Sequence, residues 1–127
     1  MSNKGVEIGI HLSPGLRDEE FVALALGNLA AFRLAGEKGE KLQWQVFRIT
    51  GGRDHHFRLV VRHPEHVLDL GLRKKLEEHM SDLSGFSEDE LRVRFQAAVK
   101  SGLNVQPLKT VPENLDLWSD NFWNWLG

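Results

Sequence analysis

The sequence predicts one α+β domain over residues 1–127, in which a small antiparallel or mixed sheet of three to four strands packs with helices. Three observations lead to this class. The N-terminal region alternates between apolar and polar residues, two further strand-like segments flank a glycine turn, and the remaining segments repeat apolar residues at helical spacing. The chain is also shorter than the ~250 residues at which one core usually divides into two.

The first strand is predicted near the N-terminus. Apolar residues occupy every second position from Val6 to Leu12, and Glu7, Gly9 and His11 stand between them. This period of two is typical of a strand with one buried face.

The first helix is predicted over residues 17–35. Three acidic residues at 18–20 suit the positive end of the helix dipole, and the segment that follows is apolar almost all round. Only Gly27, Asn28 and Arg33 interrupt it. One contact with a sheet covers a single stripe of a helix. We therefore expect either that this helix lies centrally, with elements on both sides, or that part of it lies in a subunit interface.

A hairpin is predicted from residues 42–50 and 55–63, joined by a turn over residues 51–54. If the four turn residues form the loop, Trp44 lies opposite Val61, and the two faces of the hairpin follow. One face is apolar and comprises Leu42, Trp44, Val46, Phe57, Leu59 and Val61. The other face is mixed and comprises Gln43, Gln45, Phe47, Ile49, His56, Arg58, Val60 and Arg62.

Two further helices are predicted, over residues 64–83 and from a capping box at Ser87 and Glu90 to Gly102. A short edge strand within residues 103–111 and an aromatic helix or tail over residues 112–127 would complete the chain. With that last strand, the order contains the β-α-β-β-α-β series of a ferredoxin-like sandwich, with an extra helix before the final strand and a C-terminal helix after it.

Basic side chains gather on the hairpin, since residues 41–75 contain eight Lys or Arg and three Asp or Glu. His56, Arg58 and Arg62 alternate onto one face of the second hairpin strand, and Arg53 lies in the turn. Guanidinium groups bind carboxylate or phosphate in a bidentate manner, so these four residues are a candidate anion site. A solvated strand face is the simpler interpretation. Only Phe47 could stack a base, so we do not expect a nucleic acid.

Histidines cluster at positions 55, 56, 63 and 66, but their spacing matches no metal motif. The hairpin pairing separates its tip from His63 by about 23 Å, at ~3.3 Å per residue, which is too far to share an ion. We predict no metal site and no cofactor.

The C-terminal segment contains Trp118, Phe122, Trp123 and Trp125 within eight residues. Rings of this kind bury about 150–250 Å² each, so exposing them to water would be costly. Two interpretations remain open. The tail folds back over its own sheet or helices, or it docks in a groove of a second copy or of a different protein, where Trp side chains dominate the binding energy.

The remaining observations bear on the class of protein. There is no cysteine, no nucleophile elbow and no phosphate-binding loop, so we assign no catalytic residue. No apolar run approaches the ~20 residues of a membrane span, and the N-terminus lacks a signal-peptide block, so we expect a cytoplasmic protein. The sequence favours a non-catalytic protein–protein interaction or adaptor domain that forms a homodimer. The alternative is a small-molecule or anion-binding domain, including an enzyme, that uses the basic hairpin.

Overall fold

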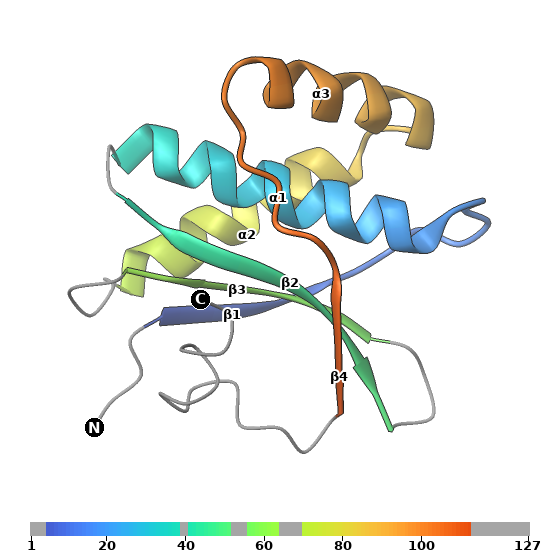
Figure 1. Ribbon diagram of the computed structural model, residues 1–127, viewed down its shortest axis with the longest axis horizontal. Coiled ribbons are helices and arrows are strands. Elements are labelled where there is room, and N and C mark those ends of the chain that lie inside the picture. Colours follow the sequence, from blue (N-terminus) through green and yellow to red (C-terminus); the bar gives the residue numbers. More distant parts are fainter. Residues whose placement is uncertain (1–4, 39–40, 52–55, 64–69, 113–127) are drawn as a thin grey trace.

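The computed structural model describes residues 5–38, 41–51, 56–63 and 70–112. Within them the elements follow in the order β1 (Gly5–Ile10), α1 (Glu19–Lys38), β2 (Gln43–Thr50), β3 (His56–Arg62), α2 (Leu70–Ser84), α3 (Glu88–Lys100) and β4 (Lys109–Pro112) (Figure 1). The α+β class and this order of elements confirm the prediction. The predicted C-terminal helix, beyond Pro112, lies outside the described residues.

The four strands form one mixed sheet in the order β1-β3-β2-β4. β3 pairs antiparallel with both β1 and β2, and Trp44 lies opposite Val61, as the hairpin register predicted. β4 pairs parallel with β2 at the opposite edge from β1. A ferredoxin-like sandwich places its last strand beside the first, so this sheet shares the element order of that fold but differs in strand order. The outer edge of β1 is consequently an edge of the sheet.

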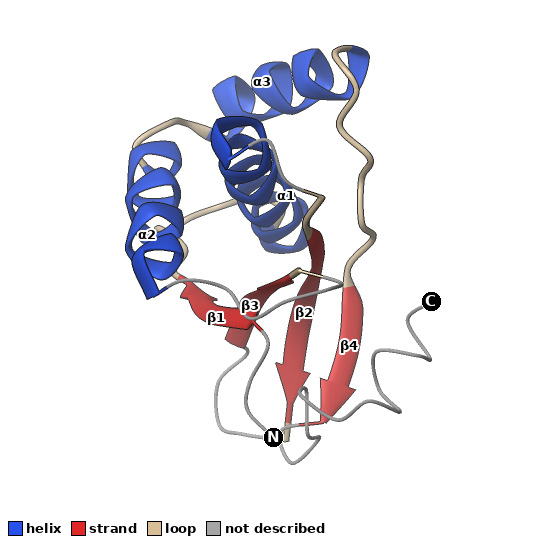
Figure 2. Cartoon of the chain, turned by 90° about the vertical axis from the view of Figure 1, so that its left-hand side faces the viewer, coloured by secondary structure: helices blue, strands red, loops and turns tan. Residues whose placement is uncertain are grey.

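The helices lie on one side of the sheet (Figure 2). α1 packs against β1, β2 and β3, against α2 along its side, and against α3. This central position agrees with the first of the two expectations and explains why α1 is apolar nearly all round. Most of its apolar side chains are buried within one chain, whereas Phe21, Leu24, Phe32 and Ala35 are half-buried. None of the helices among the described residues is long and apolar enough to cross a membrane.

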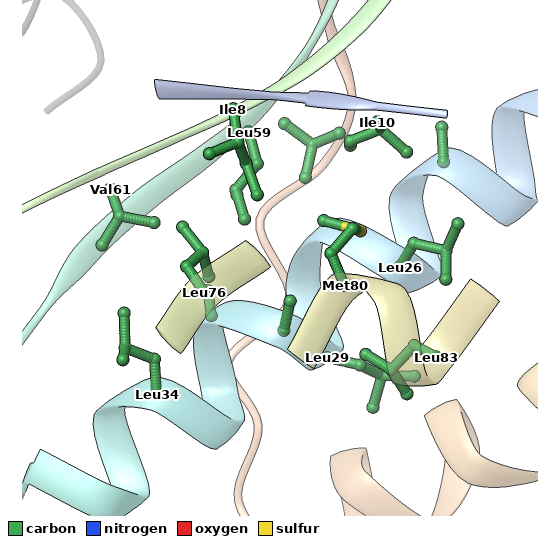
Figure 3. Packing of buried hydrophobic residues seen from close by; sticks show 14 of the residues in the cluster. Ile8, Ile10, Leu26, Leu29, Leu34, Leu59, Val61, Leu76, Met80 and Leu83 are labelled. Carbon is green, nitrogen blue, oxygen red and sulfur yellow. The ribbon is translucent and has the colours of Figure 1, made fainter. Parts of the chain in front are cut away.

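The main core lies between the sheet and the helices (Figure 3). β1 and β3 send their alternate apolar residues toward α1 and α2, as the period of two predicted. From the strands the core contains Val6, Ile8, Ile10, Phe57, Leu59 and Val61, and from the helices Leu26, Leu29, Leu34, Leu72, Leu76, Met80 and Leu83.

The sheet face that points away from the helices has a buried apolar centre. Phe47 and Val60 have no exposed surface, and Ile49 and Val111 retain only 4%. These four side chains are thus buried within one chain. The sequence predicted a mixed face here, and Arg58 lies opposite Phe47 on it.

Candidate functional site

A groove of about 420 Å³ runs between β1 and α2. It lies at the open edge of the sheet, where α2 passes above the outer side of β1 (Figure 2). The lining residues come from β1, from the segment just after it, and from one face of α2. On α2 they are three or four positions apart, which places their side chains on the same face of the helix. The lining residues are Ile8, Gly9, His11, Arg73, Glu77, Met80, Ser81 and Ser84.

On the strand side of the groove, the backbone of β1 is exposed at Gly9. No strand within the described residues pairs with the outer edge of β1. Gly9 is exposed, and a Cβ atom added there would meet only the ring of His11, with Nε2 3.7 Å away. An edge strand presents backbone N–H and C=O groups that another chain can bind. β1 therefore offers hydrogen-bonding groups with little side-chain obstruction.

The floor and the rim of the groove differ in polarity. Ile8 and Met80 form an apolar floor and are themselves largely buried, at 5% and 6% exposed. On the rim, Arg73 Nε lies 3.0 Å from Glu77 Oε1, and both side chains are more than half exposed. Such an ion pair one helical turn apart contributes only about 0.3–0.5 kcal/mol to stability, so a ligand could rearrange it at little cost.

The groove also contains the His11 imidazole and the hydroxyls of Ser81 and Ser84. The hydroxyl of Ser84 donates to the Met80 carbonyl at 2.6 Å, which is a common bond for serine within a helix. Among the described residues, no group of three or more His, Asp or Glu side chains could hold a metal ion. The groove thus offers apolar contact, backbone hydrogen bonding, one imidazole, two serine hydroxyls and one exposed ion pair.

The predicted anion site is only partly described. Arg58 and Arg62 both lie in β3, but each has a partner on a neighbouring strand. Arg58 Nη1 lies 2.8 Å from Glu7 Oε1, and Arg62 Nε donates to Gln43 Oε1 at 2.8 Å. An anion at Arg58 would therefore have to compete with a carboxylate that is already in place.

The other predicted site residues are not brought into this arrangement. His56 is the first residue of β3, and Arg53 lies outside the described residues. Trp118, Phe122, Trp123 and Trp125, the predicted partner-binding residues, also lie outside them. Their role stays a prediction.

Sequence reasoning missed the groove, although it predicted both of its walls. Residues 6–12 were assigned to a strand and residues 64–83 to a helix, without any indication that the two lie side by side. The pair Gly9 and His11 was the available signal, since a glycine in a strand often marks a place where another backbone approaches. Which strand lies at an edge depends on the whole sheet.

Comparison with known protein families places nearly the whole chain in one of them. A family model with the description "Protein of unknown function (DUF2004)" matches residues 1–126. No curated protein matches the chain significantly.

Proposed function

We propose that this chain, which belongs to the DUF2004 family, is a non-catalytic protein-interaction domain that holds a partner protein in the groove between β1 and α2. The observation that carries the proposal is the open edge of β1, with a groove of about 420 Å³ beside it. Its apolar floor supplies contact area, and the edge strand supplies hydrogen bonds.

The composition of β1 supports a protein partner. Exposed sheet edges associate with other chains unless Pro, Lys, a bulge or a covering element protects them. β1 reads Gly-Val-Glu-Ile-Gly-Ile and contains neither Pro nor Lys. Its single charged side chain, Glu7, is paired with Arg58 on the next strand. This edge thus lacks the residues that normally prevent association.

Site-specific photo-crosslinking in the cells that naturally make the protein tests this function. A photoreactive amino acid would replace Ser81, which lines the groove, or its neighbour Asp82, which is equally exposed on α2 but does not line it. We expect a defined protein adduct from position 81 and little from position 82. The absence of an adduct at position 81, or equal adducts at both positions, would contradict the proposal.

Self-association is a second proposal, and it now rests on the aromatic tail alone. Most of the apolar surface of α1, which is the other reason to expect a dimer, packs against the sheet, α2 and α3 of its own chain. Four large rings within eight residues still favour an intermolecular contact. Light scattering should give a mass of about 29 kDa, twice the 14.5 kDa of the chain. A mass of 14.5 kDa at all concentrations would exclude the dimer.

The alternative of a small-molecule or anion-binding domain is less well supported, because Glu7 and Gln43 already engage Arg58 and Arg62. A thermal-shift screen with phosphorylated and carboxylated metabolites tests it, since a ligand that binds only the folded state raises Tm. The alternative requires a rise that Arg58→Ala abolishes. We propose the cytoplasm as the compartment, in keeping with a chain that contains no cysteine.

A further inference from the structure

We infer that the partner enters the groove as an extended peptide segment, which adds to the free edge of β1 as a fifth strand of the sheet. This inference rests on the proposed function, and it specifies the chemistry of the partner. Strand addition of this kind draws its affinity from main-chain hydrogen bonds and its selectivity from pockets that receive every second side chain.

The position of α2 determines which side chains the peptide needs. Of the strands, α2 packs chiefly against β1, and it stands over the outer side of that strand (Figure 2). A new strand about 4.8 Å from β1 would therefore run beneath α2. Successive side chains would point alternately up into the groove, against Ile8 and Met80, and down toward the opposite side. The fitting partner has apolar residues at every second position.

A peptide fits this place better than a second copy of the domain. If the β1 strands of two copies paired about a two-fold axis, both α2 helices would stand on the same side, above neighbouring strands. Packed helices need 8–10 Å between their axes, whereas the two strands would be only about 4.8 Å apart. Because α2 stands over the outer side of β1, the two helices would collide. A single strand brings no second helix, so this collision does not arise.

The charges at the groove point to the same class of partner. Arg73 and Glu77 already neutralise each other at 3.0 Å, so the rim shows no strong preference for an acidic or a basic peptide. Selectivity must come from the shape and the apolar floor. Neutral segments with alternating apolar residues satisfy both.

The first test uses a phage-displayed library of random linear twelve-residue peptides as the probe, selected against the full chain. Selected peptides would be synthesised, and their Kd measured for the wild type, Ser81→Trp and Asp82→Trp. The two variants place the same ring on the same helix, but only the first fills the groove. We expect Ser81→Trp to raise the Kd by about tenfold or more and Asp82→Trp to leave it within about twofold. Circular dichroism would verify that both variants are folded.

The second test needs no protein variant. Each backbone amide of a selected peptide is N-methylated in turn, which removes one hydrogen-bond donor at a time. Strand addition predicts that methylation abolishes binding at alternate positions only, because every second N–H faces β1. In the complex, alternate amides of residues 5–10 should also exchange their hydrogens more slowly than in the free protein.

The outcomes separate this inference from the proposed function. No selected peptide, equal tolerance to methylation along the peptide, or binding that Ser81→Trp does not weaken would each overturn strand addition. If position 81 still forms protein adducts in cells, the interaction function stands with a different kind of partner. If the free protein forms a dimer in which the amides of residues 5–10 that face away from β3 are already protected, a second copy occupies the edge and the inference is wrong.

Discussion

Two neighbouring residues of α1, Gly27 and Asn28, interrupt its apolar run, and each is explained by a residue far along the chain. A Cβ atom added to Gly27 would lie 2.5 Å from Val46 Cγ2, so glycine permits the helix to approach β2 closely. Asn28 is completely buried and uses both ends of its amide. Its Nδ2 donates to the carbonyls of Leu24 and Gln106, and its Oδ1 accepts from Trp44 Nε1 and the Gln106 backbone N–H.

Gly27→Ala should destabilise the protein, even though alanine is the better helix former by about 1 kcal/mol. The added methyl group has to displace Val46, which is fully buried and β-branched, so its side chain is stiff. We expect a net loss of about 1–3 kcal/mol in the free energy of unfolding, measured with urea. Gly36→Ala is the matched control, since nothing lies within 4 Å of its added Cβ atom. That variant should gain up to about 1 kcal/mol, and equal effects at both positions would disprove the close-approach argument.

Asn28→Ala should loosen the segment that leads from α3 to β4. It leaves the Trp44 indole N–H and the Gln106 backbone N–H without an acceptor, at about 1–3 kcal/mol for each group that water cannot reach. We expect a loss of about 2–4 kcal/mol in stability and faster hydrogen exchange at the Gln106 amide. Gln106→Ala serves as the control, because the network uses only the backbone of that residue. If Asn28→Ala left exchange at Gln106 unchanged, the bond would have no structural role.

Of the three described helices, α3 is the most exposed. It packs mainly against α1. It buries Leu91 and Ala98, whereas Val93 is 66% exposed. Its contact with α1 includes the edge-to-face pair of Phe21 and Phe95, whose ring centroids are 5.8 Å apart. With so little buried surface, the local interactions at the ends of α3 contribute a large share of its stability.

The N-terminal cap of α3 should therefore contribute measurably to the stability of this helix. The Ser87 side chain accepts a hydrogen bond from the Glu90 backbone N–H at 3.2 Å, as the capping box predicted. Ser87→Ala should cost about 1 kcal/mol and speed hydrogen exchange in the first turn of α3. Ser87→Asp retains an acceptor and should remain within a few tenths of a kcal/mol of the wild type. A similar loss in both variants would assign the effect to something other than the cap.

In the whole molecule, α1 lies between the sheet and α3, α2 lies beside α1 and also contacts β1, and the outer edge of β1 lies at the opposite side of the described sheet from β4 (Figure 1). The proposed strand-binding edge and the proposed dimer contact involve different residues, 5–10 and 113–127, so experiments can change one without altering the other.

Deletion of residues 113–127 should abolish self-association and leave peptide binding at β1 intact. We expect light scattering to show a fall from dimer to monomer, because the deletion removes Trp118, Phe122, Trp123 and Trp125. Replacing Asn121 and Asn124 with serine keeps the rings and should keep the dimer. Reduced solubility without a change in assembly would instead mean that the rings pack on their own subunit.

The sequence by itself determined the elements and the pairing within the hairpin, since these follow from local periodicity. The alternation in β1, the register of Trp44 with Val61 and the cap at Ser87 all depend on residues that are close in the chain. Only the tertiary structure decided that β4 joins β2, that no other described strand pairs with the outer edge of β1, and that α1 packs against the sheet and two helices of its own chain. The pairing of Phe47 with Lys109, for example, joins two strands that are separated along the chain by β3, α2 and α3. Such choices depend on the packing energy of the complete molecule, which no local pattern contains.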